Sequence, residues 1–148
     1  MIEINNLTNF KVDKKSFSQV AKKVLLGENR RTENISLAFV DAEEIKKLNK
    51  KFRKKNKPTD VLSFSAEGGP ASGWNLDNKN YLGEIVICPE IVKENAKKYP
   101  STGSERAAFK QEMLKVFVHG ILHLCGYDHE KSKKEEEIME SKQNLYLK

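Results

Sequence analysis

The sequence lacks any long apolar run. Of its 148 residues, 38% are hydrophobic and 32% are charged, and no apolar stretch approaches the roughly twenty residues that a membrane helix needs. The first ten residues, MIEINNLTNF, contain no basic region followed by an apolar run, so we expect no secretory signal. A chain of this length is typical of one globular domain. We therefore predict a single domain over residues 1–148 that does not contact a membrane.

Cysteine is also scarce. Cys88 and Cys125 are the two cysteines of the chain, which is too few for a disulfide framework. We interpret both as reduced thiols that belong to the core. A reducing compartment suits such thiols, so the sequence predicts a cytoplasmic protein.

Arginine is rare although the chain is basic. The net charge is +6, and nearly all of the cations are lysines. Positive charge is typical of nucleic-acid-binding surfaces, but it is equally typical of solvated helix faces in a lysine-rich protein. Charge alone leaves both interpretations open. The four arginines are Arg30, Arg31, Arg53 and Arg106.

The hydrophobic pattern predicts strands and helices that intermix, which indicates an α/β or α+β protein. Apolar alternation and β-branched residues predict strands over 2–7, 35–40, 60–65 and 81–88. Amphipathic periodicity predicts helices over 16–28, 42–53, 89–99, 104–124 and 133–147. Gly27 is expected to end the first helix. Asp41 and Ser132 are expected to cap two later ones, and a Gly- and Asn-rich loop is expected over 66–80.

All three histidines lie in one short window, HGILHLCGYDH at residues 119–129. His119 and His123 are one helical turn apart, so their side chains share a helix face. Gly126 can adopt positive φ and turn the chain back, which would bring His129 to the same ion. Three imidazoles and a water form an open zinc site, and zinc lowers the pKa of that water to about 7. The sequence therefore predicts one catalytic zinc ion per chain.

Two neighbouring residues have alternative interpretations. Cys125 is a conceivable substitute ligand, but it lies about 200° around a helix from His123, so we interpret it as a core residue. Asp128 is predicted either to orient His129 or to cap the turn. Packing histidines or a purely structural metal site are the alternative explanations for the cluster. The spacing, together with the glycine at the turn, favours the open metal site.

The histidine spacing matches that of the metzincin peptidases, but one residue does not match. The peptidase motif has a glutamate directly after the first histidine, where it acts as general base. Here that position is Gly120. A zinc peptidase without this base would lose help that is typically worth 10²–10⁴-fold in rate. The difference points to another substrate, and a metallohydrolase acting on peptides is kept as an alternative.

Four segments together resemble the YbeY family of bacterial metal-dependent endoribonucleases. HGILHLCGYDH resembles the histidine signature of that family, and LNKKFRKKNKPTDVLSF at residues 48–64 resembles its second signature block. YLGEIVIC at residues 81–88 resembles the third, and IME at 138–140 resembles the C-terminal tail. The order and spacing of these segments agree over about two-thirds of the chain.

The resemblance implies an α+β fold in which a small mixed sheet of about four strands packs with helices, with the motif helix buried. It implies that His119, His123 and His129 are the metal ligands and that Arg53 is functionally important. The implied activity is zinc-dependent endoribonuclease action on single-stranded RNA. The implied setting is ribosomal RNA processing, including 16S rRNA 3′-end maturation, and ribosome quality control. Ribosomal RNA is the implied partner, with proteins of the small subunit as further candidates. A non-catalytic ribosome-assembly factor is the second alternative.

The residue chemistry around Arg53 supports such a role independently. A guanidinium group is a planar fork that binds phosphate oxygens bidentately, and it would offset charge that builds up on a phosphate beside a metal ion. A solvated helix end is the alternative. Three flanking lysines are candidates for following an RNA backbone: Lys54, Lys55 and Lys57.

Two more residues near these motifs keep two interpretations each. Asp60 is expected to brace the turn after Pro58 rather than to act in the site. Trp74, in the loop over residues 66–80, is predicted either to stack on a base or to close the loop over the core.

Overall fold

The computed structural model describes residues 2–66, 80–98, 104–128 and 130–148. Its elements follow the predicted segments closely. The strands are β1 (Ile2–Asn6), β2 (Asn34–Phe39), β3 (Val61–Ser65) and β4 (Tyr81–Ile87). The helices are α1 (Lys14–Gly27), α2 (Ala42–Arg53), α3 (Pro89–Lys98), α4 (Glu105–Leu124) and α5 (Lys133–Tyr146). Most of the predicted loop, including Trp74, lies outside the described residues.

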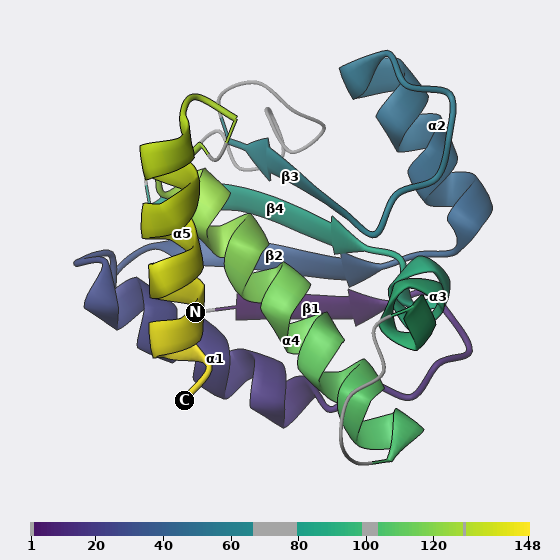
Figure 1. The fold of residues 1–148 in the computed structure, drawn as a ribbon, viewed down its shortest axis with the longest axis horizontal. Coiled ribbons are helices and arrows are strands. Elements are labelled where there is room, and N and C mark those ends of the chain that lie inside the picture. The colour runs from purple at the N-terminus through teal and green to yellow at the C-terminus, as the bar shows by residue number, and fades with distance from the viewer. Residues whose placement is uncertain (1, 67–79, 99–103, 129) are drawn as a thin grey trace.

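The four strands form one mixed sheet in the order β1-β2-β4-β3 (Figure 1). β1, β2 and β4 run parallel to one another, and β3 runs antiparallel to β4. The register places Ile4, Leu37 and Ile85 side by side across the three parallel strands. The predicted α+β class with about four mixed strands is therefore confirmed.

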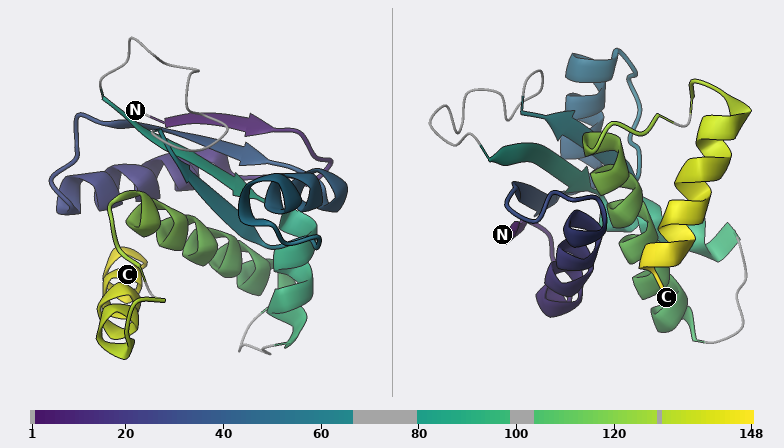
Figure 2. Two further views of the ribbon diagram at one scale, coloured as in Figure 1. Left: turned by 90° about the horizontal axis from the view of Figure 1, so that it is seen from above. Right: turned by 90° about the vertical axis from the view of Figure 1, so that its left-hand side faces the viewer.

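The two faces of the sheet carry separate hydrophobic clusters, because successive side chains of a strand point to opposite faces. Ile85 and Ile87 belong to the larger cluster, with residues of α1, α4 and α5, and these helices cover one face of the sheet (Figures 1 and 2). Val86, between them, packs with Ile45 of α2 on the other face. None of the described helices is long and apolar enough to cross a membrane.

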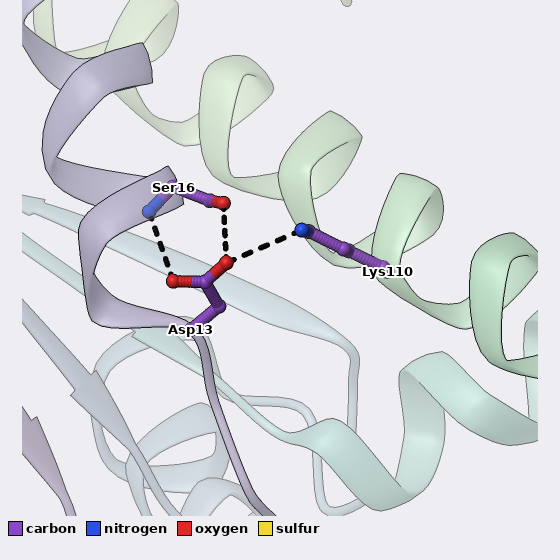
Figure 3. A network of polar contacts seen from close by, with 3 residues as sticks. All are labelled: Asp13, Ser16 and Lys110. Carbon is purple, nitrogen blue, oxygen red and sulfur yellow. Dashed lines mark hydrogen bonds and ion pairs between the residues drawn. The ribbon is translucent and has the colours of Figure 1, made fainter.

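Helix caps fix where the main elements begin. The side chains of Asp41 and Ser132 accept hydrogen bonds from the amides three residues later, which confirms both predicted caps. Asp13 caps α1 in the same way and also contacts α4 (Figure 3): its carboxylate accepts from Ser16 Oγ at 2.6 Å and from Lys110 Nζ at 3.2 Å. Hydrogen bonds from Ser16 and then from Lys110 lower the pKa of Asp13 to about 2. The contact ties the start of α1 to the first half of α4.

Helix α1 ends at Gly27, as predicted. Gly27 is the last helical residue, and the residue with positive φ is Asn29, at 61°. A Cβ at position 27 would lie 2.5 Å from Cε1 of Tyr146. Glycine leaves room here for the Tyr146 ring, with which α5 packs closely against the end of α1.

Candidate metal centre

Helix α4 brings two of the predicted ligands together. The Nε2 atoms of His119 and His123 are 3.0 Å apart, and their ring planes meet at 80°. The opposite side of this helix is fixed in the core, where Phe117, Val118 and Ile121 have no exposed surface. The predicted buried helix is thus confirmed, and it holds both imidazoles at one point.

The turn after α4 has the predicted geometry. Gly126 has a φ of 104°, its amide donates to the carbonyl of His123, and the amide of Tyr127 donates to the carbonyl of Leu122. This pair of hydrogen bonds is the Schellman arrangement that reverses a chain at a helix end. His129 lies outside the described residues, so its role as third ligand stays a prediction. Asp128 accepts a hydrogen bond from the amide of Glu130 at 3.0 Å, which is the capping role.

The two described histidines fit a zinc ion chemically. Gln143 Oε1 lies 2.8 Å from His119 Nδ1. Since an amide oxygen can only accept, Nδ1 carries the proton, and in the neutral ring Nε2 presents a lone pair. Two nitrogens bound to one tetrahedral zinc ion would be roughly 3.3 Å apart, which is close to the 3.0 Å observed. Imidazole also suits nickel and copper, so the donor set does not identify the metal.

Of the two cysteines that we interpreted as core residues, Cys88 is buried and Cys125 is only half-buried. Cys88 has no exposed surface. Cys125 packs against the larger hydrophobic cluster, and burial raises the pKa of its thiol to about 11. Cys125 is not among the described residues that line the cavity containing His119 and His123, so the structure does not offer it as a ligand.

His119 and His123 line a cavity of about 740 Å³. The end of α2 and the segment that follows it line the same cavity. Arg53, Lys55 and Lys57 line the same cavity, whereas Lys54 is not among its described lining residues. Lys131, which sequence reasoning missed, adds a fourth cation. Three carboxylate-bearing residues also line it: Asp60, Asp128 and Glu130.

A buried asparagine that sequence reasoning also missed holds the Arg53 segment in place. Asn49 is 2% exposed. Its carbonyl accepts from the amides of Lys54 and Lys55, and its Nδ2 donates to the carbonyl of Lys57 at 2.9 Å. Lys54 itself has a φ of 61°, which lets the chain leave the helix sharply. A polar residue one helical turn after buried Ile45 is the signal that could have identified it.

Replacing Asn49 by aspartate is expected to destabilise the protein by about 2–4 kcal/mol. The substitution exchanges a donor for a second acceptor opposite the carbonyl of Lys57 and buries a carboxylate. Urea unfolding at pH 7 measures the loss, and trypsin is expected to cut faster after Lys54 and Lys55, whereas the bond after Lys57 precedes Pro58 and resists trypsin. Asn144→Asp, at an exposed position of α5, is the matched control, and equal stability of the two variants would contradict this account.

Asp60 has the structural role expected of it. Its carbonyl accepts from the amide of Cys88 at 2.9 Å, and its carboxylate accepts from the hydroxyl of Thr59 at 3.4 Å. These contacts fix the start of β3 beside the end of β4. The residue also lines the cavity, so it stands near the histidines as well.

The position after the first histidine faces the sheet. Gly120 is buried, and a Cβ there would lie 3.0 Å from Ile85 Cγ2 and 3.0 Å from Ser63 Oγ. The carbonyl of Gly120 accepts a hydrogen bond from the Ser63 hydroxyl at 3.2 Å. A peptidase glutamate would have no room at this position.

Comparison with known proteins agrees with this architecture. The family described as Endoribonuclease YbeY matches residues 3–148. The Endoribonuclease YbeY of Thermotoga neapolitana is 42% identical over 114 residues, which are 77% of this chain and 65% of that protein. The Endoribonuclease YbeY of Aliarcobacter butzleri is 35% identical over 145 residues, 95% of this chain and 91% of that one. The match thus spans about 65% of the length of the Thermotoga relatives.

A solved structure supports the same assignment. The solution structure of TM1509 from Thermotoga maritima superposes with a TM-score of 0.67 at 33% sequence identity, and covers 99% of this chain and 87% of that one. The shared fold and the family match together include the α4 helix and its turn. The chain therefore belongs to the Endoribonuclease YbeY family.

Proposed function

We propose that this chain is a zinc-dependent endoribonuclease that cuts single-stranded RNA. One observation carries the proposal: His119 and His123 line the same cavity as Arg53 and two lysines of the segment after α2. A pair of converging imidazoles beside a guanidinium group suits phosphodiester cleavage. The names of the relatives, Endoribonuclease YbeY, support the reaction class.

The protein groups have distinct tasks in this proposal. His119, His123 and, beyond the turn, His129 would hold zinc, which supplies a Lewis acid and lowers the pKa of bound water. Arg53 binds two oxygens of the scissile phosphate and offsets the charge that develops on it. The nucleophile is either water or the neighbouring 2′-hydroxyl, and the two leave different RNA ends.

The lysines hold the RNA backbone on either side of the cut. Lys55 and Lys57 line the cavity beside Arg53, and Lys131 lines it after the turn. Contacts between ammonium groups and phosphates do not depend on sequence and weaken as salt rises. Lys54, the remaining predicted RNA contact, would meet the backbone outside the cavity.

We place this activity in ribosomal RNA processing in the cytoplasm. The substrate of this proposal is precursor small-subunit RNA, whose 16S 3′ end is matured, and ribosome quality control is a second setting. Proteins of the small ribosomal subunit are the proposed further partners. Abundant positive charge, +6 over the chain, suits an RNA-rich partner.

Two other functions make different predictions. A peptide metallohydrolase needs a general base where Gly120 packs against the sheet, so the geometry disfavours it. A non-catalytic assembly factor would bind zinc and RNA without cutting the RNA. In that case chelation would lower the melting temperature, and Arg53→Ala would alter RNA binding alone.

Cleavage of an end-labelled single-stranded RNA that spans the 3′ end of precursor small-subunit rRNA tests the proposal. His123→Ala is expected to abolish cutting, and Arg53→Ala is expected to lower its rate by about 10²–10³-fold. Chelation is expected to stop the reaction, and zinc is expected to restore it. Arg106→Ala, which removes an exposed arginine at the start of α4, is the matched control and is expected to cut normally.

Each other outcome has a definite meaning. Cutting that persists in His123→Ala would contradict the proposed metal site. Binding of zinc and RNA by the wild type with no cutting in any lane would favour the assembly factor. Cleavage of casein that His123→Ala abolishes would favour the peptide hydrolase.

A further inference from the structure

Helix α5 supplies a polar contact to the metal centre from a distant part of the sequence. Gln143 is one of three buried polar or charged residues among those the structure describes. It is 8% exposed, and its Oε1 is 2.8 Å from Nδ1 of His119, which precedes it by 24 residues. Figures 1 and 2 show α5 beside the C-terminal part of α4.

This contact determines which nitrogen of His119 faces the cavity. An amide oxygen has no hydrogen to give, so it accepts from Nδ1–H and disfavours the tautomer that carries its proton on Nε2. The Nε2 atom is then directed at Nε2 of His123, 3.0 Å away. The ring has one orientation in which both contacts are made.

Gln143 is itself held firmly. Met139 and Tyr146 lie one turn before and after it on the same face of α5, and both are buried, at 1% and 5% exposed. The backbone carbonyl of Gln143 accepts from the amide of Leu147 at 3.1 Å, which holds this last turn of α5 in helical form. The backbone of Gln143 is therefore fixed beside α4, and its carboxamide oxygen reaches Nδ1 of His119 from there.

We propose that Gln143 is a positioning residue that aligns His119 for zinc by accepting a hydrogen bond from Nδ1. This inference rests on the proposed zinc site. Partners of metal-ligating histidines fix the tautomer and the ring orientation, and their loss typically costs 10–100-fold in metal affinity. A contact that served only to dock α5 on α4 would leave zinc affinity unchanged.

Zinc affinity, measured by competition with a chromophoric chelator, tests the proposal. Gln143→Met keeps the length and volume of the side chain but cannot accept the hydrogen bond, and it is expected to bind zinc 10–100-fold more weakly. Gln143→Glu keeps an acceptor and is expected to bind at least as tightly as the wild type. Asn144→Met makes the same kind of change at an exposed neighbour and is expected to have no effect. If Gln143→Met does not fold, Gln143→Asn, whose amide is too short to reach Nδ1, replaces it with the same expectation.

A second readout does not depend on zinc. Nitrogen-15 NMR of the histidine rings in metal-free protein is expected to show a protonated Nδ1 on His119 in the wild type, and its hydrogen is expected to exchange faster in Gln143→Met. A loss of zinc affinity below fivefold in Gln143→Met would overturn the positioning role. A wild type that shows the Nδ1 proton but binds no zinc would refute the proposed zinc site, and with it any role of Gln143 toward zinc. Matching ring spectra in the wild type and Gln143→Met would refute the alignment itself.

Discussion

Gly120→Glu is expected to unfold the protein rather than to give it peptidase activity. The substitution would restore the glutamate that metzincin peptidases have after their first histidine. Here the new side chain would point at Ile85 and Ser63, with its Cβ only 3.0 Å from an atom of each. Overpacking and the burial of an unpaired carboxylate together are expected to cost more than about 4 kcal/mol.

Graded variants separate the causes of this loss. Gly120→Ala adds only the Cβ and is expected to cost about 1–3 kcal/mol, because the neighbours must move by a few tenths of an ångström. Lys115→Glu places the same carboxylate at an exposed position of α4 and is expected to leave stability nearly unchanged. Thermal unfolding followed by circular dichroism compares the three. A Gly120→Glu protein that melts with the wild type would show that position 120 does not face the sheet.

The parts of the fold that the sequence predicted correctly are those that depend on local chemistry. Asp41 and Ser132 begin helices because their side chains accept amides only three residues away. Gly126 ends α4 because positive φ favours glycine at a helix end. His119 and His123 meet because helical periodicity puts them on one face. Each of these needs information from only a few neighbouring residues.

The parts that the sequence did not predict depend on which elements pack together. Gln143 lies opposite His119 only because α5 folds back along α4. Asn49 holds the Arg53 segment only because the chain reverses after α2. Gly27 ends α1 as predicted, but the close approach of Tyr146, far along the chain, to that glycine could not be predicted. The helical periodicity of the sequence predicts that such residues face the interior. It does not predict which residues of other elements they contact there.

A carboxylate at the end of α1 joins three distant parts of the chain. The side chain of Glu28 is 8% exposed. It accepts from the Tyr127 hydroxyl at 2.7 Å, from the Tyr146 hydroxyl, and from Lys142 Nζ at 3.3 Å. Tyr127 belongs to the turn after the two histidines, so Glu28 anchors that turn to α1 and α5.

The ionisation of this cluster couples stability to pH. Burial raises the pKa of Glu28, but hydrogen bonds from Tyr146, Tyr127 and Lys142 lower it more, so the pKa of the folded state lies below the usual 4.5. A carboxylate with a lowered pKa stabilises the fold above pH 4.5, and this contribution disappears as pH falls through the folded value. The hydrogen bond to Glu28 raises the pKa of Tyr127 from 10.0 to about 12. Stability from this phenol is complete below pH 10 and is lost as pH rises through about 12.

Glu28→Gln is therefore expected to lower the free energy of unfolding by about 2–4 kcal/mol at pH 7, because the two phenols and the ammonium group lose a charged acceptor. The fall in stability between pH 5 and pH 3 is expected to be shallower in the variant, since the group that takes up the proton is gone. Urea unfolding across that pH range measures both effects. Glu140→Gln, at an exposed position of α5, is the control and is expected to match the wild type. Equal acid sensitivity of Glu28→Gln and the wild type would show that other carboxylates govern acid unfolding and that Glu28 is not the anchor of the turn.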